Sequence, residues 1–190
     1  MSADIEKTIF CYGKPFFPQG TFVPDRKHTC CFTGHRPDKM PTGDKLGELR
    51  LRVRTAAEFL LNRGYDTFIT GMAPGFDLFA AEILLHESEF RQVKLICALP
   101  YRYRHIKQAA EAGQSGVYLE ALEKCRTAAY FFENYDSRCY KVRNQFMVNC
   151  SSFVIAYLKD PSVLRSGTAM TLNMAEKKGV QKLVIYGNRL

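Results

Sequence analysis

The sequence of 190 residues lacks the features that mark membrane, secreted and metal-binding proteins. No run approaches the roughly 20 consecutive apolar residues of a membrane-spanning helix, and the N-terminus lacks the basic start and apolar segment of a signal peptide. Seven cysteines are scattered without a CxxC pair, which indicates a reducing compartment and argues against a zinc site. We therefore expect a cytoplasmic protein with no membrane contact and no metal.

Recognisable catalytic and nucleotide-binding signatures are also missing. The chain has no nucleophile elbow, and its glycine pattern is neither the dinucleotide fingerprint nor the P-loop sequence. Its net charge of +8 favours polyanionic partners such as nucleotides and nucleic acids. Because the basic residues are spread along the chain, a solvated basic surface is the simpler interpretation of that charge.

Beyond residue 27, short apolar runs alternate with helix-like segments, which predicts one α/β domain over residues 28–190. Continuous apolar runs are typical of strands buried on both faces, so a mainly parallel sheet flanked by helices in three layers is expected. The expected strands are 29–33, 67–70, 93–98, 128–132, 153–157 and 182–186, and the expected helices lie within 46–60, 75–84, 116–126, 140–150 and 167–178. Residues 1–27, rich in phenylalanine and proline, are predicted to form an arm that packs on the domain or on another subunit.

Three polar turns, each bearing a glycine, come after expected strands. In an open α/β sheet such turns converge at the carboxyl ends of the strands, where ligands bind. Glycine lets the backbone approach a phosphate, and the next helix offers unpaired N–H groups and a positive dipole end. The candidate ligand-binding residues on these turns are Thr33, Gly34, His35 and Arg36, then Gly71, Ala73, Gly75 and Asp77, and finally Ser166, Gly167 and Thr168.

Individual side chains on these turns suggest specific roles. Arg36 can grip a phosphate through two hydrogen bonds, and His35 can donate a hydrogen bond or carry a proton. Asp77 can accept hydrogen bonds from ribose hydroxyls. Each has a plainer alternative: a solvated turn for Arg36 and His35, a favourable charge near a helix N-terminus for Asp77, and a simple N-cap for Ser166.

Two further segments add candidates. Arg143 and Asn144 open the helix before the strand at 153–157, where an arginine can neutralise a phosphate; an exposed helical arginine is the equal alternative. Tyr101 follows the third strand and is predicted to stack on a base. The alternation of tyrosine and arginine from Tyr101 to His105 also fits single-stranded nucleic acid.

Taken together, these motifs resemble one family. The Thr-Gly-His-Arg-Pro turn at 33–37, the Gly-Met-Ala-Pro-Gly-Phe-Asp junction at 71–77 with Ala80, Ala81 and Glu82, and Arg143, Asn144, Met147, Val148 and Ser151 are similar to the YpsA-like family (DUF1273). That family belongs to the SLOG superfamily, with the LOG phosphoribohydrolases, also called lysine decarboxylase-like, and the DNA-processing protein DprA. The resemblance covers residue 28 to the C-terminus. It implies a Rossmann-like fold, a pocket for a nucleotide-derived ligand such as an ADP-ribose-like molecule, and, by analogy, a homodimer.

The resemblance to the LOG enzymes is incomplete. Those enzymes carry a glutamate three residues after a threonine that corresponds to Thr168, and this chain has Thr171 there. Hydrolysis of an N-glycosidic bond needs a carboxylate to stabilise charge on the ribose or to activate water. The catalytic candidates for such a reaction are therefore Asp77 and Glu82 as the carboxylate and His35 as the proton carrier.

Three hypotheses follow. The leading one is a protein that binds a nucleotide or a nucleotide-derived ligand as a sensor or regulator and requires no cofactor. The second is a LOG-like hydrolase of a nucleoside phosphate. The third is a nucleic-acid-binding module similar to DprA, which the net charge and the segment from Tyr101 to His105 support.

Overall fold

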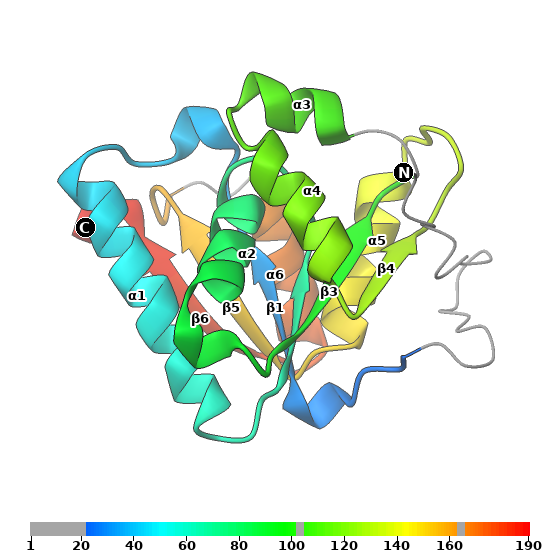
Figure 1. Ribbon diagram of the computed structural model, residues 1–190, viewed down its shortest axis with the longest axis horizontal. Coiled ribbons are helices and arrows are strands. Elements are labelled where there is room, and N and C mark those ends of the chain that lie inside the picture. The colour runs from blue at the N-terminus through cyan, green and yellow to red at the C-terminus, as the bar shows by residue number, and fades with distance from the viewer. Residues whose placement is uncertain (1–21, 102–104, 163–165) are drawn as a thin grey trace.

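The computed structural model describes residues 22–101, 105–162 and 166–190 of the chain. Its centre is one sheet of six parallel strands in the order β4-β3-β2-β1-β5-β6 (Figure 1). The strands are β1 (Thr29–Thr33), β2 (Thr67–Thr70), β3 (Lys94–Leu99), β4 (Thr127–Tyr130), β5 (Phe153–Leu158) and β6 (Gln181–Tyr186). The six strands and the parallel sheet predicted from the apolar runs are confirmed.

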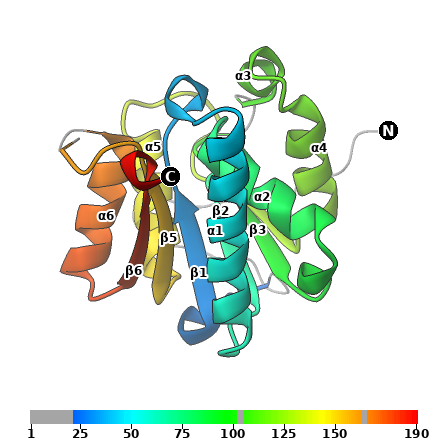
Figure 2. The ribbon, with the colours of Figure 1, turned by 90° about the vertical axis from the view of Figure 1, so that its left-hand side faces the viewer.

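Helices cover both faces of the sheet and make the three layers of a Rossmann-like fold. Figures 1 and 2 show α1, α2 and α4 on one face and α5 and α6 on the other. The helices are α1 (Asp44–Leu61), α2 (Phe76–His86), α3 (His105–Glu111), α4 (Ser115–Lys124), α5 (Cys139–Asn149) and α6 (Gly167–Lys177). The sequence did not predict α3, which is short and packs on α4.

Successive side chains of each strand point to opposite faces of the sheet, and they form one hydrophobic core on each face. In β1, Cys30 and Phe32 point into the core under α1, α2 and α4, whereas Cys31 points into the core under α5 and α6. Phe32 stacks on Phe68 of β2 with ring centroids 5.7 Å apart. Because both faces are buried, these strands read as continuous apolar runs instead of alternating ones.

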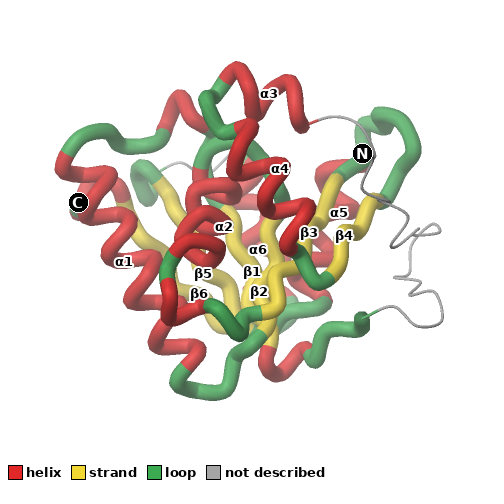
Figure 3. Tube along the Cα trace, viewed as in Figure 1, coloured by secondary structure: helices red, strands yellow, loops and turns green. Residues whose placement is uncertain are grey.

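The strand order reverses its direction at β1. The chain builds outward from β1 to β4 and then crosses to the other side of β1 to form β5 and β6. β1 therefore pairs with β2 on one side and β5 on the other. In open α/β sheets, ligands bind at the carboxyl ends of strands beside such a reversal. The loops that leave β1 and β2 there can be followed in Figure 3.

No helix within the three described ranges is long and apolar enough to cross a bilayer. Of the predicted N-terminal arm, residues 1–21 lie outside the described residues, as do residues 102–104 of the segment from Tyr101 to His105.

Candidate functional site

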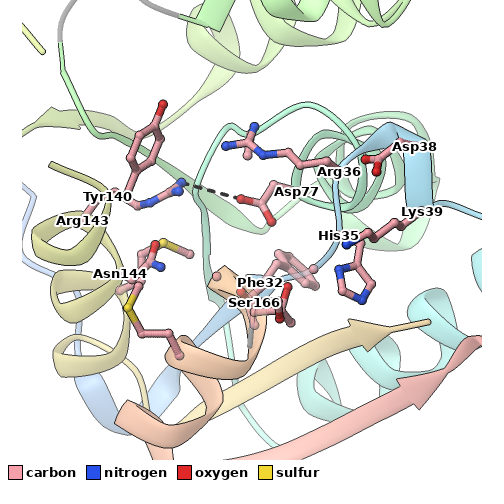
Figure 4. A pocket seen from close by; sticks show the side chains of 17 residues that line it. Phe32, His35, Arg36, Asp38, Lys39, Asp77, Tyr140, Arg143, Asn144 and Ser166 are labelled. Atoms are coloured by element: carbon pink, nitrogen blue, oxygen red, sulfur yellow. Dashed lines mark ion pairs between the residues drawn. The ribbon is translucent and has the colours of Figure 1, made fainter. Parts of the chain in front are cut away.

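A pocket of about 420 Å³ opens at the carboxyl end of the sheet, beside the strand-order reversal. It lies between the turn after β1 and the helices α5 and α6 (Figure 4). Its volume is in the range of small-molecule sites. The residues that line it are Phe32, Thr33, Gly34, His35, Arg36, Asp38, Lys39, Ala73, Asp77, Tyr140, Arg143, Asn144, Met147, Ser166, Gly167, Thr168 and Met170.

Most of the predicted site residues meet in this pocket, and four do not. The predicted residues that line it are Thr33, Gly34, His35, Arg36, Ala73, Asp77, Arg143, Asn144, Ser166, Gly167 and Thr168. Gly71, Gly75, Glu82 and Tyr101 are not among its lining residues. Glu82 instead pairs with Arg50 of α1, with 2.9 Å between nitrogen and oxygen, and Tyr101 packs edge-on against Tyr135.

The turn after β1 places a buried imidazole in the pocket. The backbone carbonyl of His35 accepts a hydrogen bond from the Phe76 amide at the start of α2, 3.0 Å away. The His35 ring packs edge-on against Tyr157, with centroids 5.9 Å apart. Burial lowers the pKa of His35, and the positive charge of Lys39 lowers it further. Its Nε2 atom is buried and has no hydrogen-bond partner in the part of the chain that the structure describes.

A buried ion pair joins α2 to α5 across one end of the pocket. An Arg143 guanidinium nitrogen lies 3.6 Å from a carboxylate oxygen of Asp77, and the side chains are 6% and 7% exposed. Arg143 also donates a hydrogen bond to the Gly71 carbonyl. This contact explains the glycine at 71, because a Cβ there would lie 2.7 Å from the Arg143 guanidinium carbon.

Opposing effects set the charges of this pair. Burial raises the pKa of Asp77, while Arg143, Arg36 and the backbone N–H groups of Ala73 and Gly34 act against that rise. Burial lowers the pKa of Arg143, although guanidinium remains protonated in proteins. The Nε atom of Arg143 is buried and has no hydrogen-bond partner among the described residues, so its N–H stays unpaired beside the ion pair with Asp77.

The N-terminus of α6 supplies backbone donors at the base of the pocket. Ser166 is the N-cap, and its hydroxyl accepts a hydrogen bond from the Ala169 amide at 3.0 Å. Within the described part of the chain, the amides of Gly167 and Thr168 have no hydrogen-bond partner. A Cβ placed on Gly167 would meet no atom within 4 Å. These amides and the helix dipole make this end suited to an anion.

Gly75, the N-cap of α2, has a packing role and does not offer a free N–H. Gly75 has φ of +99°, and a Cβ on it would lie 2.8 Å from the carbonyl carbon of Arg36. Its N–H donates to the side-chain oxygen of Gln114 at 2.8 Å, and its carbonyl accepts from the same amide group at 3.3 Å. Gly75 therefore allows the turns after β1 and β2 to pack together, and its N–H is already occupied.

Six lining residues were absent from the sequence prediction: Phe32, Asp38, Lys39, Tyr140, Met147 and Met170. The 3-10 turn at Pro37–Lys39, which directly follows the predicted motif, brings Asp38 and Lys39 to the pocket. Because Asp38 and Lys39 directly follow that motif, the sequence could have identified them as site residues. Met147 belongs to the segment that resembles the YpsA-like family, which was also a usable signal. Met170 carried none, since a methionine on a half-buried helix is an ordinary core residue. Among the described residues, no three His, Cys, Asp or Glu side chains are grouped to hold a metal.

Comparison with known proteins supports the fold. No protein-family model and no curated protein matches the sequence. A solved structure of DNA processing protein A from Helicobacter pylori, which reports a single-stranded DNA binding mode, is similar with a TM-score of 0.53 and 18% identity. The match covers 85% of this chain and 65% of that one. DNA processing protein A (DprA) from Streptococcus pneumoniae is similar with a TM-score of 0.54 and 14% identity, over 85% of this chain and 50% of that one.

This chain thus spans about two thirds and half of the length of these two structures. At such identities the likeness concerns the fold alone. It agrees with the Rossmann-like α/β fold that the resemblance implied.

Proposed function

We propose that this protein binds a nucleotide or a nucleotide-derived ligand, such as an ADP-ribose-like molecule, as a sensor or regulator. One observation carries the proposal: Nε2 of His35 and Nε of Arg143 are buried nitrogen atoms without partners among the described residues, and both residues line one pocket from different elements. Leaving a buried polar group unpaired costs about 1–3 kcal/mol. A ligand with acceptor oxygens would remove that cost, with the neutral His35 ring in its Nε2–H tautomer.

Phosphate is the acceptor that fits the surrounding charges. Arg36 and Lys39 are exposed cations on the pocket rim, and the free amides of Gly167 and Thr168 lie at the N-terminus of α6. In the proposed complex, the α6 amides and Arg36 hold the phosphate groups, and the unpaired Nε–H of Arg143 donates to an oxygen of the ligand. Asp77, held by Arg143 and by backbone N–H groups, faces the ribose.

The arrangement favours binding over hydrolysis. Thr171, at the position of the LOG glutamate, is buried, and its hydroxyl donates to the Gly167 carbonyl at 2.9 Å. Glu82 is engaged with Arg50. The carboxylates among the described lining residues are Asp38 and Asp77, and Asp77 is committed to Arg143. No unengaged buried carboxylate among the described residues takes the place of the missing glutamate.

Calorimetric titration of the purified chain with AMP, ADP, NAD and ADP-ribose tests this function. We expect at least one to bind, and Arg36→Ala to weaken that binding about 10- to 100-fold through loss of a charge-assisted hydrogen bond. Because Arg36 is exposed, the stability should change by less than about 0.5 kcal/mol. Arg91→Ala, which removes another exposed arginine outside the pocket, should leave binding unchanged.

The same mixtures distinguish a sensor from an enzyme. Mass spectrometry after the titration should recover the bound ligand intact. A cleaved ligand would instead support the hydrolase hypothesis, and Asp77→Asn would then be the next variant to assay. Failure of all four compounds to bind would contradict the proposed function.

A second candidate is binding of single-stranded nucleic acid. The similar fold of the Helicobacter pylori protein, with its reported single-stranded DNA binding mode, favours it, as does the net charge of +8. Fluorescence anisotropy with a labelled oligonucleotide should then show affinity that falls steeply as salt rises. Arg36→Ala should weaken that binding more than Arg91→Ala if the strand enters the pocket. Equal effects of the two variants would indicate a diffuse basic surface.

Membership of the YpsA-like family is also a proposal. The motifs at 33–37, 71–77 and 143–151 resemble the YpsA-like family, and the Rossmann-like fold of this chain is compatible with membership. We infer that the chain is a YpsA-like member of the SLOG superfamily that keeps the ligand pocket without the LOG carboxylate.

A further inference from the structure

The two sides of the pocket differ in chemistry. Figure 4 shows His35 and Lys39 on one side and Tyr140, Arg143 and Asn144 of α5 on the other. The first side carries the cations Arg36 and Lys39 and one carboxylate, Asp38, so its net charge is positive. On the second side the charge of Arg143 is balanced by Asp77. A ligand that satisfies both sides has an anionic end and an uncharged end.

Asn144 adds an uncharged polar group to the second side, beside Tyr140 and Arg143. The residue is only 8% exposed, and within the described residues its side-chain amide makes no hydrogen bond. An asparagine amide presents a donor and an acceptor side by side. The edge of a nucleobase presents the complementary pair, as in the two-bond contact of asparagine with adenine.

Two methionine side chains also line the pocket on the side of α5 and α6. Met147 follows Asn144 by three residues on α5 and is 2% exposed, and Met170 comes from the first turn of α6. Both line the pocket. Methionine sulfur makes favourable contacts with aromatic rings, and its flexible side chain adapts to a flat surface. A sugar, with hydroxyl groups around its ring, would leave donors facing these apolar atoms.

We propose that Asn144, Met147 and Met170 form a nucleobase subsite, in which the amide contacts the edge of the base and the thioethers contact its face. This inference rests on the proposed function, because it assigns the second half of the same ligand. It makes the ligand a nucleoside phosphate and not a sugar phosphate. It also places the base on α5 and α6, away from Tyr101.

The test compares AMP with ribose 5-phosphate, which lacks the base, by calorimetry on the full chain. We expect the wild type to bind AMP at least about tenfold more tightly. Asn144→Leu, which has a similar volume and no amide, should weaken AMP binding about tenfold or more and change ribose 5-phosphate binding less than about twofold. Gln145→Leu is the matched control: Gln145 lies on the same helix outside the pocket and bonds to Asn149.

The outcomes separate the two proposals. Equal binding of AMP and ribose 5-phosphate by the wild type, or equal weakening of both in Asn144→Leu, would overturn the base subsite and leave phosphate binding intact. If the wild type binds neither compound, the base subsite is overturned, and the proposed function is overturned as well if ADP, NAD and ADP-ribose also fail to bind. Retained ribose 5-phosphate binding shows that the variant is folded. If Asn144→Leu does not fold, Asn144→Ala, which adds no apolar bulk, takes its place with the same expected results.

Discussion

The turns after β2 and β5 both place a glycine at the beginning of a helix on the carboxyl side of the sheet, yet they serve different purposes. Gly75, before α2, is packed against the backbone of His35 and Arg36, and Gln114 occupies its N–H. Gly167, which begins α6, has open space where a Cβ would lie, and its amide has no partner among the described residues. Gly75 therefore serves the packing of two turns, whereas Gly167 leaves room for the ligand that we propose.

The largest effect is expected from Gly75→Ala. A side chain at φ of +99° is strained, and its Cβ would overlap the turn after β1, so we expect a loss of about 2–4 kcal/mol in the free energy of unfolding. Urea denaturation measures it. Gly113→Ala is a useful control, because its φ of +69° is also positive while nothing lies within 4 Å of the added Cβ. If both variants lose the same stability, backbone strain and not turn packing explains Gly75.

Gly167→Ala should show the opposite behaviour. The added methyl group meets no protein atom and should change the unfolding free energy by less than about 0.5 kcal/mol. It would stand where the proposed phosphate approaches the α6 amides, so ligand affinity should fall about tenfold. Denaturation and calorimetry on the same preparation check both values. Unchanged affinity for a ligand that the wild type binds would remove Gly167 from the site.

The smallest expected effect is a pH dependence of ligand affinity. It tests whether His35, unlike the occupied Gly75 N–H, is free to contact the ligand. Burial and Lys39 lower the pKa of His35 below 6.5, and a bound phosphate near Nε2 would raise it again. Binding then takes up a proton, so affinity for ADP-ribose should increase about three- to tenfold as pH falls from 8 to below the lowered pKa. His35→Gln, which does not titrate, should flatten this dependence. If the affinity of His35→Gln depends on pH as strongly as that of the wild type, His35 does not contact the phosphate.

The lowered pKa of His35 also affects the stability of the protein without ligand. A histidine whose pKa is lowered by folding binds its proton less readily in the folded chain than in the unfolded one. The stabilising contribution of neutral His35 is therefore complete above pH 6.5 and decreases as pH falls through the lowered pKa. Ligand affinity and stability should thus change in opposite directions as the solution is acidified.

Much of the fold could be predicted because its signals are local. Each buried strand is a continuous apolar run, and α1 has a clear three- and four-residue repeat that ends before Gly64. The missed helix, α3, is only seven residues long and follows a segment of tyrosines and arginines without apolar periodicity. Short helices depend on packing for their stability, which the sequence does not reveal.

The site was predictable where its residues directly follow strands. Thr33, Gly34, His35 and Arg36 line the pocket because the end of β1 fixes their position. The partnership of Asp77 with Arg143 could not be predicted, since it depends on how α5 packs across the sheet. Likewise, the sequence indicates that Asn144 belongs to a helix, but not that its amide faces a cavity.

Backbone amide NMR spectra recorded during a titration with ADP-ribose test the central claim most directly. If the pocket binds the phosphates through the α6 amides, the signals of Gly167, Thr168 and His35 should shift in a saturable way. The Gly75 amide, held by Gln114, should move much less. Saturable shifts confined to residues outside the pocket, or no shifts at all, would contradict the account.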